Sequence, residues 1–212
     1  VSKMRASIYV LGPLLARLKE AKVSFPGGCA IGTRPIDLHL QAMEALGAHI
    51  SVDFGYINAR TDALQGNDIY FSKSSVGATI NALMAAVLAK GKTRIFNAAM
   101  EPEVDSTVDL LNKMGAKITG RETTTLEIEG VAELFPVEMT IIPDRIEAGT
   151  FLIAGALSNY PVTVANCEPA HLNAVLEKLR EAGCELEMED KAITVIPPAS
   201  IKPVNLMTLP YP

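Results

Sequence analysis

Leu46-Gly47-Ala48-His49-Ile50 recurs in pattern at Met114-Gly115-Ala116-Lys117-Ile118 and at Ala182-Gly183-Cys184-Glu185-Leu186. In each copy an amphipathic stretch ends, a glycine and a small residue follow, and an extended run begins. The three glycines are spaced 68 residues apart. Glycine at this place favours the left-handed backbone conformation that ends a helix. The spacing therefore predicts three copies of one structural unit, each about 68 residues long.

Two helices are predicted in each unit. The helix just before each glycine is amphipathic, over residues 35–46, 101–114 and 170–182. A more apolar helix lies upstream, over residues 5–18, 76–90 and 145–157. Gly12-Pro13 should kink or split the first of these. Because the apolar residues of these upstream helices run nearly all round, we expect them to be buried on most sides.

Short strands connect the helices. One strand is predicted between the two helices of each unit, over residues 22–25, 92–97 and 161–166, and two more follow each glycine. The unit thus reads helix, strand, helix, strand, strand. Pro143 disfavours helix in the residue before it, and Asp144 with Glu147 resembles a helix start. We expect residues 1–143 to hold two repeats of one domain and residues 144–212 to hold one repeat of a second.

The composition is that of a globular protein rather than a disordered or fibrous one. Of the 212 residues 49% are apolar and 20% are charged, with 24 acidic against 19 basic residues. This balance argues against general nucleic-acid binding, and no apolar run approaches the roughly 20 residues of a membrane span. The three scattered cysteines fit neither a disulfide framework nor a metal site. A cytoplasmic location is the natural interpretation.

The segment around Cys29 has the features of a binding loop. Gly27, Gly28 and Gly32 leave its backbone open to close approach by a ligand, and Arg34 stands just before a proline suited to a helix start. An anion here would meet a guanidinium and free helix amides, and a cysteine in that field favours the thiolate. The alternative is a buried structural cysteine in a tight turn beside a solvated arginine. From the residues alone, both interpretations stay open.

Two further segments could contact an anion. Lys73, Ser74 and Ser75 lead into the apolar helix at Val76, and their hydroxyl and ammonium groups suit phosphate oxygens, although ordinary helix capping explains the serines equally well. Arg5 lies at the start of the first helix, where a positive charge opposes the helix dipole. Either Arg5 binds an anion or the true start of that helix lies earlier.

The remaining cysteines and histidines look structural. Cys167 and Cys184 are predicted to be packing residues, the latter in the slot that Ala48 and Ala116 fill in the other units. The histidines at positions 39 and 171 have no ligand partners nearby in the sequence, so neither supports a metal site.

Pro26-Gly27-Gly28-Cys29-Ala30-Ile31-Gly32-Thr33-Arg34-Pro35-Ile36-Asp37-Leu38-His39 resembles the catalytic loop of enolpyruvyl transferases that act on UDP-N-acetylglucosamine. Further segments resemble the same family in the same order, namely residues 4–7, 75–79, 97–103 and 143–151. The resemblance implies an inside-out α/β barrel, with buried helices and outer sheets. It also implies transfer of enolpyruvyl from phosphoenolpyruvate to the 3′-hydroxyl of UDP-N-acetylglucosamine, with release of phosphate, in peptidoglycan synthesis. No metal or organic cofactor is implied.

The resemblance also assigns roles. Cys29 matches the cysteine that donates a proton to the methylene carbon of phosphoenolpyruvate and that the antibiotic fosfomycin alkylates. Arg34, Pro35, Ile36, Asp37 and Leu38 match the segment that holds the sugar nucleotide. A further set matches groups around the anionic ligands: Arg5, Lys73, Ser74, Ser75 and Val76.

Other parts of the family pattern are expected outside this chain, at both ends. They include a first repeat with a Lys-Asn pair, an aspartate that handles the hydroxyl proton, and further arginines. We therefore expect the chain to be inactive alone, and association with copies of itself or with a complementary fragment is a further expectation. Two alternatives stay open: a shikimate-pathway enolpyruvyl transferase, and a non-catalytic sugar-nucleotide-binding protein.

Overall fold

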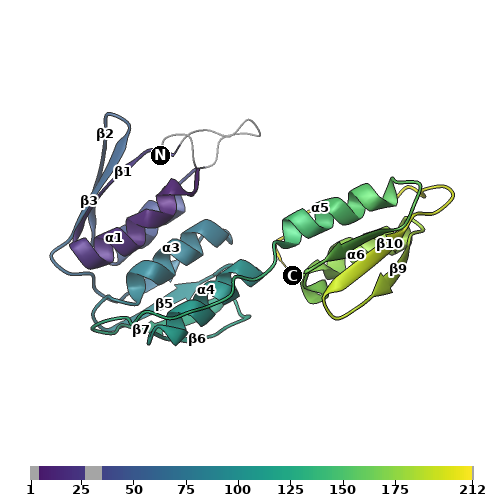
Figure 1. The fold of residues 1–212 in the computed structure, drawn as a ribbon. Coiled ribbons are helices and arrows are strands. Elements are labelled where there is room, and N and C mark those ends of the chain that lie inside the picture. The colour runs from purple at the N-terminus through teal and green to yellow at the C-terminus, as the bar shows by residue number, and fades with distance from the viewer. Residues whose placement is uncertain (1–4, 27–34, 212) are drawn as a thin grey trace. The chain divides into compact units, whose positions relative to one another are not determined.

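The computed structural model describes residues 5–26 and 35–211, and the chain divides into two compact units with the boundary between Met139 and Thr140 (Figure 1). Each unit is described by itself. The predicted domain boundary at residues 143 and 144 lies close to this division, and the assignment of the two units to separate three-repeat domains stays a prediction. Within the described ranges, no helix combines the length and the apolar character needed to cross a bilayer.

Unit 1 contains the first two repeats. Its elements in chain order are η1 (Arg5–Val10), α1 (Leu11–Leu18), β1 (Glu20–Ser24), α2 (Asp37–Ala45), β2 (His49–Asp53), β3 (Tyr56–Arg60), β4 (Asp68–Tyr70), α3 (Val76–Ala86), β5 (Lys92–Phe96), α4 (Pro102–Lys113), β6 (Lys117–Thr119) and β7 (Thr125–Glu129). Unit 2 contains α5 (Arg145–Ala156), β8 (Val162–Ala165), η2 (Pro169–Leu172), α6 (Asn173–Glu181), β9 (Glu185–Met188) and β10 (Ala192–Ile196).

The sheets confirm the predicted repeat. Each repeat supplies three antiparallel strands in the spatial order first, third, second, as in β1-β3-β2, β5-β7-β6 and β8-β10-β9. The middle sheet has a fourth strand, β4, which pairs parallel with β5. Strand β4 was not predicted from the sequence. A run of only three residues, one of them acidic, carries no period-two signal long enough to detect.

The same hydrogen-bonded cap ends the second helix of every repeat. Gly47, Gly115 and Gly183 have φ angles of +88°, +99° and +99°. Each glycine N–H donates to the carbonyl three residues earlier, and the next N–H donates to the carbonyl five residues earlier, at 2.9–3.0 Å. This pair of bonds is a Schellman motif, which satisfies carbonyl groups that the helix leaves free. The glycine positions that predicted the repeat are therefore confirmed.

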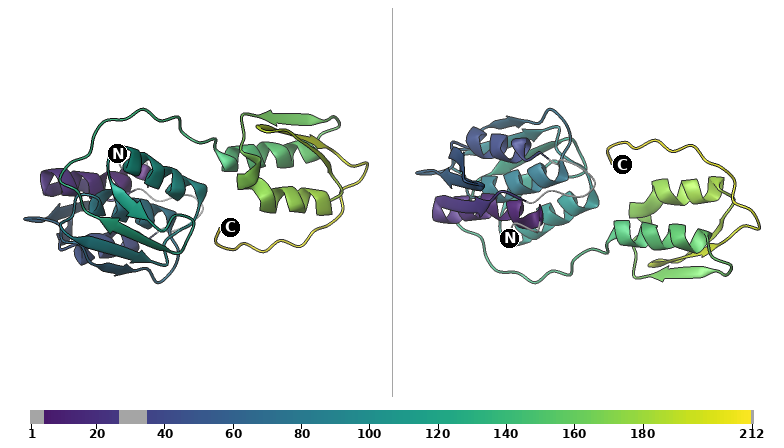
Figure 2. Two further views of the ribbon diagram at one scale, coloured as in Figure 1. Left: turned by 90° about the horizontal axis from the view of Figure 1, so that it is seen from below. Right: turned by 90° about the horizontal axis from the view of Figure 1, so that it is seen from above.

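Helices lie inside unit 1 and its sheets lie outside. Helix α3 packs against α1, α2 and α4, and the two sheets lie to either side of this helical layer (Figures 1 and 2). The buried residues of α3 include Ala78, Ala82, Leu83 and Ala86. The expectation of buried helices with outer sheets is thus confirmed, although the described strands form open sheets rather than a closed barrel.

Three helix boundaries differ from those predicted. The expected break near Gly12-Pro13 falls between η1 and α1, one residue before Gly12. Helix α2 starts at Asp37, so Pro35 precedes the helix rather than forming its first turn. Helix α3 ends at Ala86, four residues before the predicted end at position 90, because the chain turns there toward β5.

In unit 2 the prediction that the apolar helix is buried on most sides is wrong. Helix α5 buries Leu152 and most of its small residues, but Ile146 and Phe151 are 62% and 56% exposed, as is 72% of its C-cap residue Leu157. One repeat supplies one sheet and one further helix, which cover only one side of α5. Asp144 does cap α5 as expected, since its Oδ1 accepts hydrogen bonds from the N–H groups of Ile146 and Glu147.

Candidate functional site

The predicted ligand-binding residues gather at the starts of three helices of unit 1. Arg5 begins η1, although its side chain is not described. Cys29 and Arg34 lie outside the described residues, in the connection between β1 and α2. The other predicted residues stand just before or inside the first turns of α2 and α3.

At the start of α2, the described side chains alternate between solvent and core. Pro35 and Asp37 are exposed, whereas Ile36 and Leu38 are 4% and 5% exposed and belong to the hydrophobic core. Ile36 occupies the N-cap position, and no side chain of the described residues caps the helix. Uncapped N–H groups at a helix start can bind an anion, and the two buried side chains hold that start in place.

At the start of α3, the structure shows the capping role that the sequence allowed. The Ser75 hydroxyl accepts a hydrogen bond from the Ala78 N–H at 3.4 Å. Ser74, Ser75 and Val76 are half-buried, and the Lys73 side chain is exposed. One serine therefore has a structural function, while the Lys73 ammonium stands in solvent next to the helix start.

The first turns of α2 and α3 meet at Gly77, beside the last turn of η1. A Cβ atom at this position would lie 3.0 Å from the Tyr9 hydroxyl oxygen of η1 and 3.1 Å from Nε2 of His39 on α2. The Tyr9 and His39 rings meet edge-on, with centroids 6.1 Å apart. The absence of a side chain at Gly77 thus allows the helices to approach closely. The predicted residues Val76 and Leu38 each immediately precede a member of this contact.

One residue that contacts these helices, Asn81, was not predicted from the sequence. Asn81 lies in the middle of the apolar helix α3, is 0% exposed, and hydrogen-bonds to groups on η1, α1 and α2. The signal was available, because a polar side chain inside an apolar helix must find partners in the core.

The two cysteines of unit 2 are packing residues, as predicted. Cys167 and Cys184 are free thiols that are 2% and 6% exposed, and both belong to the core of unit 2. Burial raises the pKa of both thiols, which disfavours the reactive thiolate. Neither cysteine is a candidate nucleophile.

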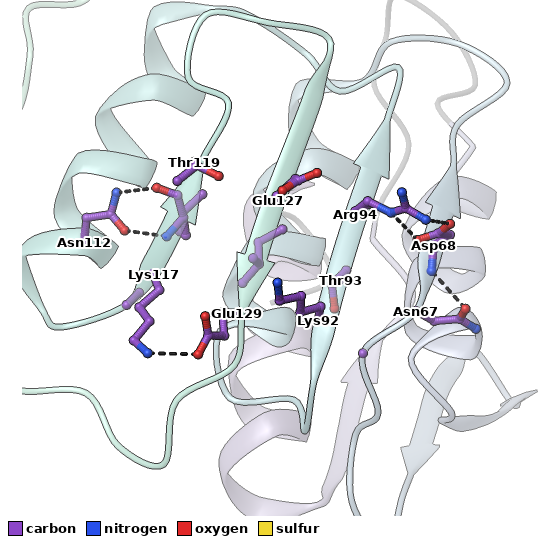
Figure 3. Close-up of a pocket in the computed structure, with 14 residues that line it drawn as sticks. Asn67, Asp68, Lys92, Thr93, Arg94, Asn112, Lys117, Thr119, Glu127 and Glu129 are labelled. Carbon is purple, nitrogen blue, oxygen red and sulfur yellow. Dashed lines mark hydrogen bonds and ion pairs between the residues drawn. The ribbon is translucent and has the colours of Figure 1, made fainter.

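A hollow of about 890 Å³ lies over the outer face of the β4-β5-β7-β6 sheet (Figure 3). Three basic and three acidic residues line it, and four of these six pair with each other: Arg94 donates to both carboxylate oxygens of Asp68, and Lys117 donates to Glu129 at 2.9 Å. These hydrogen bonds lower the pKa of Asp68 and of Glu129. Among the predicted ligand-binding residues that the structure describes, none lines this hollow. Its paired charges leave no net attraction for an anion, so we place the candidate site at the helix starts.

Comparison with known proteins gives the same family. The family model described as EPSP synthase (3-phosphoshikimate 1-carboxyvinyltransferase) matches residues 1–212. The chain belongs to this enolpyruvyl transferase family. Many curated relatives are named UDP-N-acetylglucosamine 1-carboxyvinyltransferase, including those of Desulfosudis oleivorans, 55% identical over 212 residues, and Chloroherpeton thalassium, 56% identical over 214 residues. Both alignments cover the whole of this chain, which spans about half the length of these relatives, 51% and 50%.

Solved structures of enolpyruvyl transferases share the fold. NikO from Streptomyces tendae has a TM-score of 0.73 at 21% identity, over 91% of this chain and 47% of that one. EPSP synthase from Acinetobacter baumannii has a TM-score of 0.68 at 18% identity, over 95% of this chain and 48% of that one. The expected fold class is therefore confirmed for this enolpyruvyl transferase chain.

Proposed function

We propose that the protein containing this chain transfers enolpyruvyl from phosphoenolpyruvate to the 3′-hydroxyl of UDP-N-acetylglucosamine, in the cytoplasm and in peptidoglycan synthesis. The hydroxyl group gives up its proton to a base and its oxygen adds to the central carbon of phosphoenolpyruvate, while the methylene carbon of phosphoenolpyruvate takes up a proton. The tetrahedral adduct then loses that proton and phosphate, which restores the double bond. The names of the curated relatives support this choice of acceptor.

One observation carries the proposal. The first turns of α2 and α3 meet at Gly77, beside Tyr9 of η1, so a ligand bound at either helix start lies close to the other. Both substrates are anions, and helix starts with nearby cations stabilise negative charge as it develops. We assign Arg5 and the stretch 73–76 to binding around this charge, and the stretch 34–38 to holding the sugar nucleotide.

Cys29 is assigned as the proton donor to the methylene carbon. Fosfomycin tests this role, because it alkylates a thiolate. We expect mass spectrometry of the full-length protein to show one adduct at Cys29, which Cys29→Ser abolishes. The buried Cys167 and Cys184 serve as internal controls with raised pKa values. A protein that binds UDP-N-acetylglucosamine without any adduct at Cys29 would instead be a non-catalytic sugar-nucleotide-binding protein.

Phosphate release distinguishes the two acceptors. With phosphoenolpyruvate present, the full-length protein should release phosphate on addition of UDP-N-acetylglucosamine and not on addition of 3-phosphoshikimate. The description of the family model names the latter acceptor, so the reverse result would assign the shikimate-pathway reaction. This chain spans about half the length of its relatives. We therefore propose that it is inactive by itself and catalyses the reaction only together with further polypeptide. Product formation by the purified 212-residue chain would contradict this.

A further inference from the structure

A buried amide on α3 joins three other helices around the candidate site, namely η1, α1 and α2. Asn81 on α3 accepts a hydrogen bond at Oδ1 from the Gly12 N–H of α1, at 2.8 Å. Its Nδ2 group donates to the carbonyl of Ile8 on η1 and meets Nδ1 of His39 on α2, both at 3.1 Å. Both N–H bonds and the carbonyl of this side chain therefore have partners on other helices.

The partners fix the orientation of the amide. A backbone N–H only donates and a backbone carbonyl only accepts, so Oδ1 of Asn81 must face Gly12 and Nδ2 must face Ile8. The second Nδ2 proton then points at His39 Nδ1, which must accept it. This places the proton of the neutral imidazole on Nε2, the atom that lies against Gly77. The His39 ring is thereby held in one tautomer and one direction.

The tight packing around Asn81 leaves little freedom to adjust. A Cβ atom on Gly12 would lie 2.4 Å from the Asn81 backbone oxygen, so α1 and α3 are in backbone contact at this place. Ile8 is one helical turn after Arg5, and His39 and Gly77 each follow directly on a stretch assigned to substrate. A change at Asn81 thus displaces all three groups of assigned residues together.

We infer that Asn81 is a positioning residue for the anionic substrates, and this rests on the proposed function. Its side chain is 0% exposed, so it acts through the helices that it contacts, η1, α1 and α2, rather than by touching a ligand. Small displacements of binding groups weaken binding strongly even when the altered residue is remote from them. The alternative is that Asn81 only stabilises the fold, and the experiment must distinguish this from an effect on ligand binding.

Asn112 provides the matched control. Its side chain also bridges backbone groups, since Oδ1 accepts from the Ile118 N–H at 2.9 Å and Nδ2 donates to the Ile118 carbonyl at 3.0 Å. It lies near the end of α4, away from the helix starts that meet at Gly77. Loss of its bonds should therefore lower stability without affecting the candidate site.

The test compares Asn81→Leu with Asn112→Leu in the full-length protein, by calorimetric titration with UDP-N-acetylglucosamine and by thermal unfolding. We expect Kd to rise about tenfold or more in Asn81→Leu and less than about twofold in Asn112→Leu, although both variants lower Tm. Equal Kd values in the two variants would overturn the inference alone. Absence of binding by the unsubstituted protein would overturn the proposed function and the inference with it.

A second pair of more conservative variants can be used if Asn81→Leu does not fold. Asn81→Asp keeps the acceptor for Gly12 and removes both donors, and Asn112→Asp is its control. The same contrast in Kd is expected. In the unsubstituted protein, nitrogen-15 NMR should show His39 as the Nε2–H tautomer, with resonances that shift when UDP-N-acetylglucosamine binds. The Nδ1–H tautomer, or a ring unaffected by bound ligand, would contradict the inference.

Discussion

Helices α3 and α5 occupy the same place in their repeats, yet their surroundings differ sharply. Helix α3 packs against other helices on several sides and has buried residues at most positions. Helix α5 packs mainly against its own sheet and α6, and its Phe151, Ile153 and Leu157 side chains are at least half exposed. Both helices are apolar nearly all round. The extent to which such a helix is buried therefore depends on the neighbouring repeats, rather than on the helix or its own repeat.

The largest expected effect on the free energy of unfolding comes from replacing the central leucine of each helix with alanine. Leu83 and Leu152 are both 0% exposed. We expect Leu83→Ala to lower the free energy of unfolding of unit 1 by about 3–5 kcal/mol, and Leu152→Ala to lower that of unit 2 by about 2–3 kcal/mol. The second cavity lies in a thinner layer that collapses more easily. Urea unfolding followed by hydrogen exchange in β5 and β10 measures the free energy of unfolding of each unit. Equal losses in the two units would contradict the difference that we infer between α3 and α5.

The helix caps should behave alike in both units, because they depend on local conformation. Gly47 has no atom within 4 Å of an added Cβ, and at Gly183 the nearest is the Pro198 Cβ at 3.6 Å, an ordinary contact. Alanine at either place must still adopt a positive φ. Gly47→Ala and Gly183→Ala should therefore each cost about 1 kcal/mol, measured by the same unfolding experiment. A several-fold difference between them would show that tertiary packing enters the cap.

The exposed face of α5 should tolerate polar side chains. Phe151→Ser changes a side chain that is 56% exposed, so the free energy of unfolding of unit 2 should change by less than about 0.5 kcal/mol. Reduced binding of a hydrophobic dye by the chain would accompany this change. A loss as large as that of Leu152→Ala would mean that this face is covered in solution.

The smallest expected effect is a pH-dependent change in Tm, caused by an ion pair on the outer sheet of unit 1. The Lys117 amine donates to Glu129 and lowers the pKa of that carboxyl group. A carboxyl pKa below its unfolded value stabilises the fold above that unfolded value, and this contribution disappears as the pH falls through the folded pKa. Glu129→Gln should therefore lower Tm slightly at pH 7 and leave it unchanged at low pH.

The corresponding strand pair of unit 2 supplies the control for that measurement. Lys117 pairs with Glu129 between β6 and β7, whereas Glu185 on β9 pairs with Ile196 on β10. Glu185→Gln should thus leave Tm unchanged at both pH values. An equal response of the two variants would remove the ion pair as the cause.

Most of the fold was predictable because its signals are local. The glycine caps, the Asp144 cap and the alternation of helices and strands each depend on a few adjacent residues. Strand β4 was not predictable, since three residues carry too little pattern and it forms only by pairing with β5. The candidate site was predictable only as separate segments. Cys29 and Arg34 lie outside the described residues, so their roles stay predictions.

The sequence by itself determined the three repeats, their caps and the family to which the chain belongs, because backbone preferences and long motifs act over short stretches of chain. Only the tertiary structure decided that α3 is buried while α5 is half exposed, and that Gly77, His39 and Asn81 meet between three helices. Burial and hydrogen-bond partners depend on residues far away in the chain. That dependence turns an isolated asparagine in an apolar helix into the centre of the candidate site's framework.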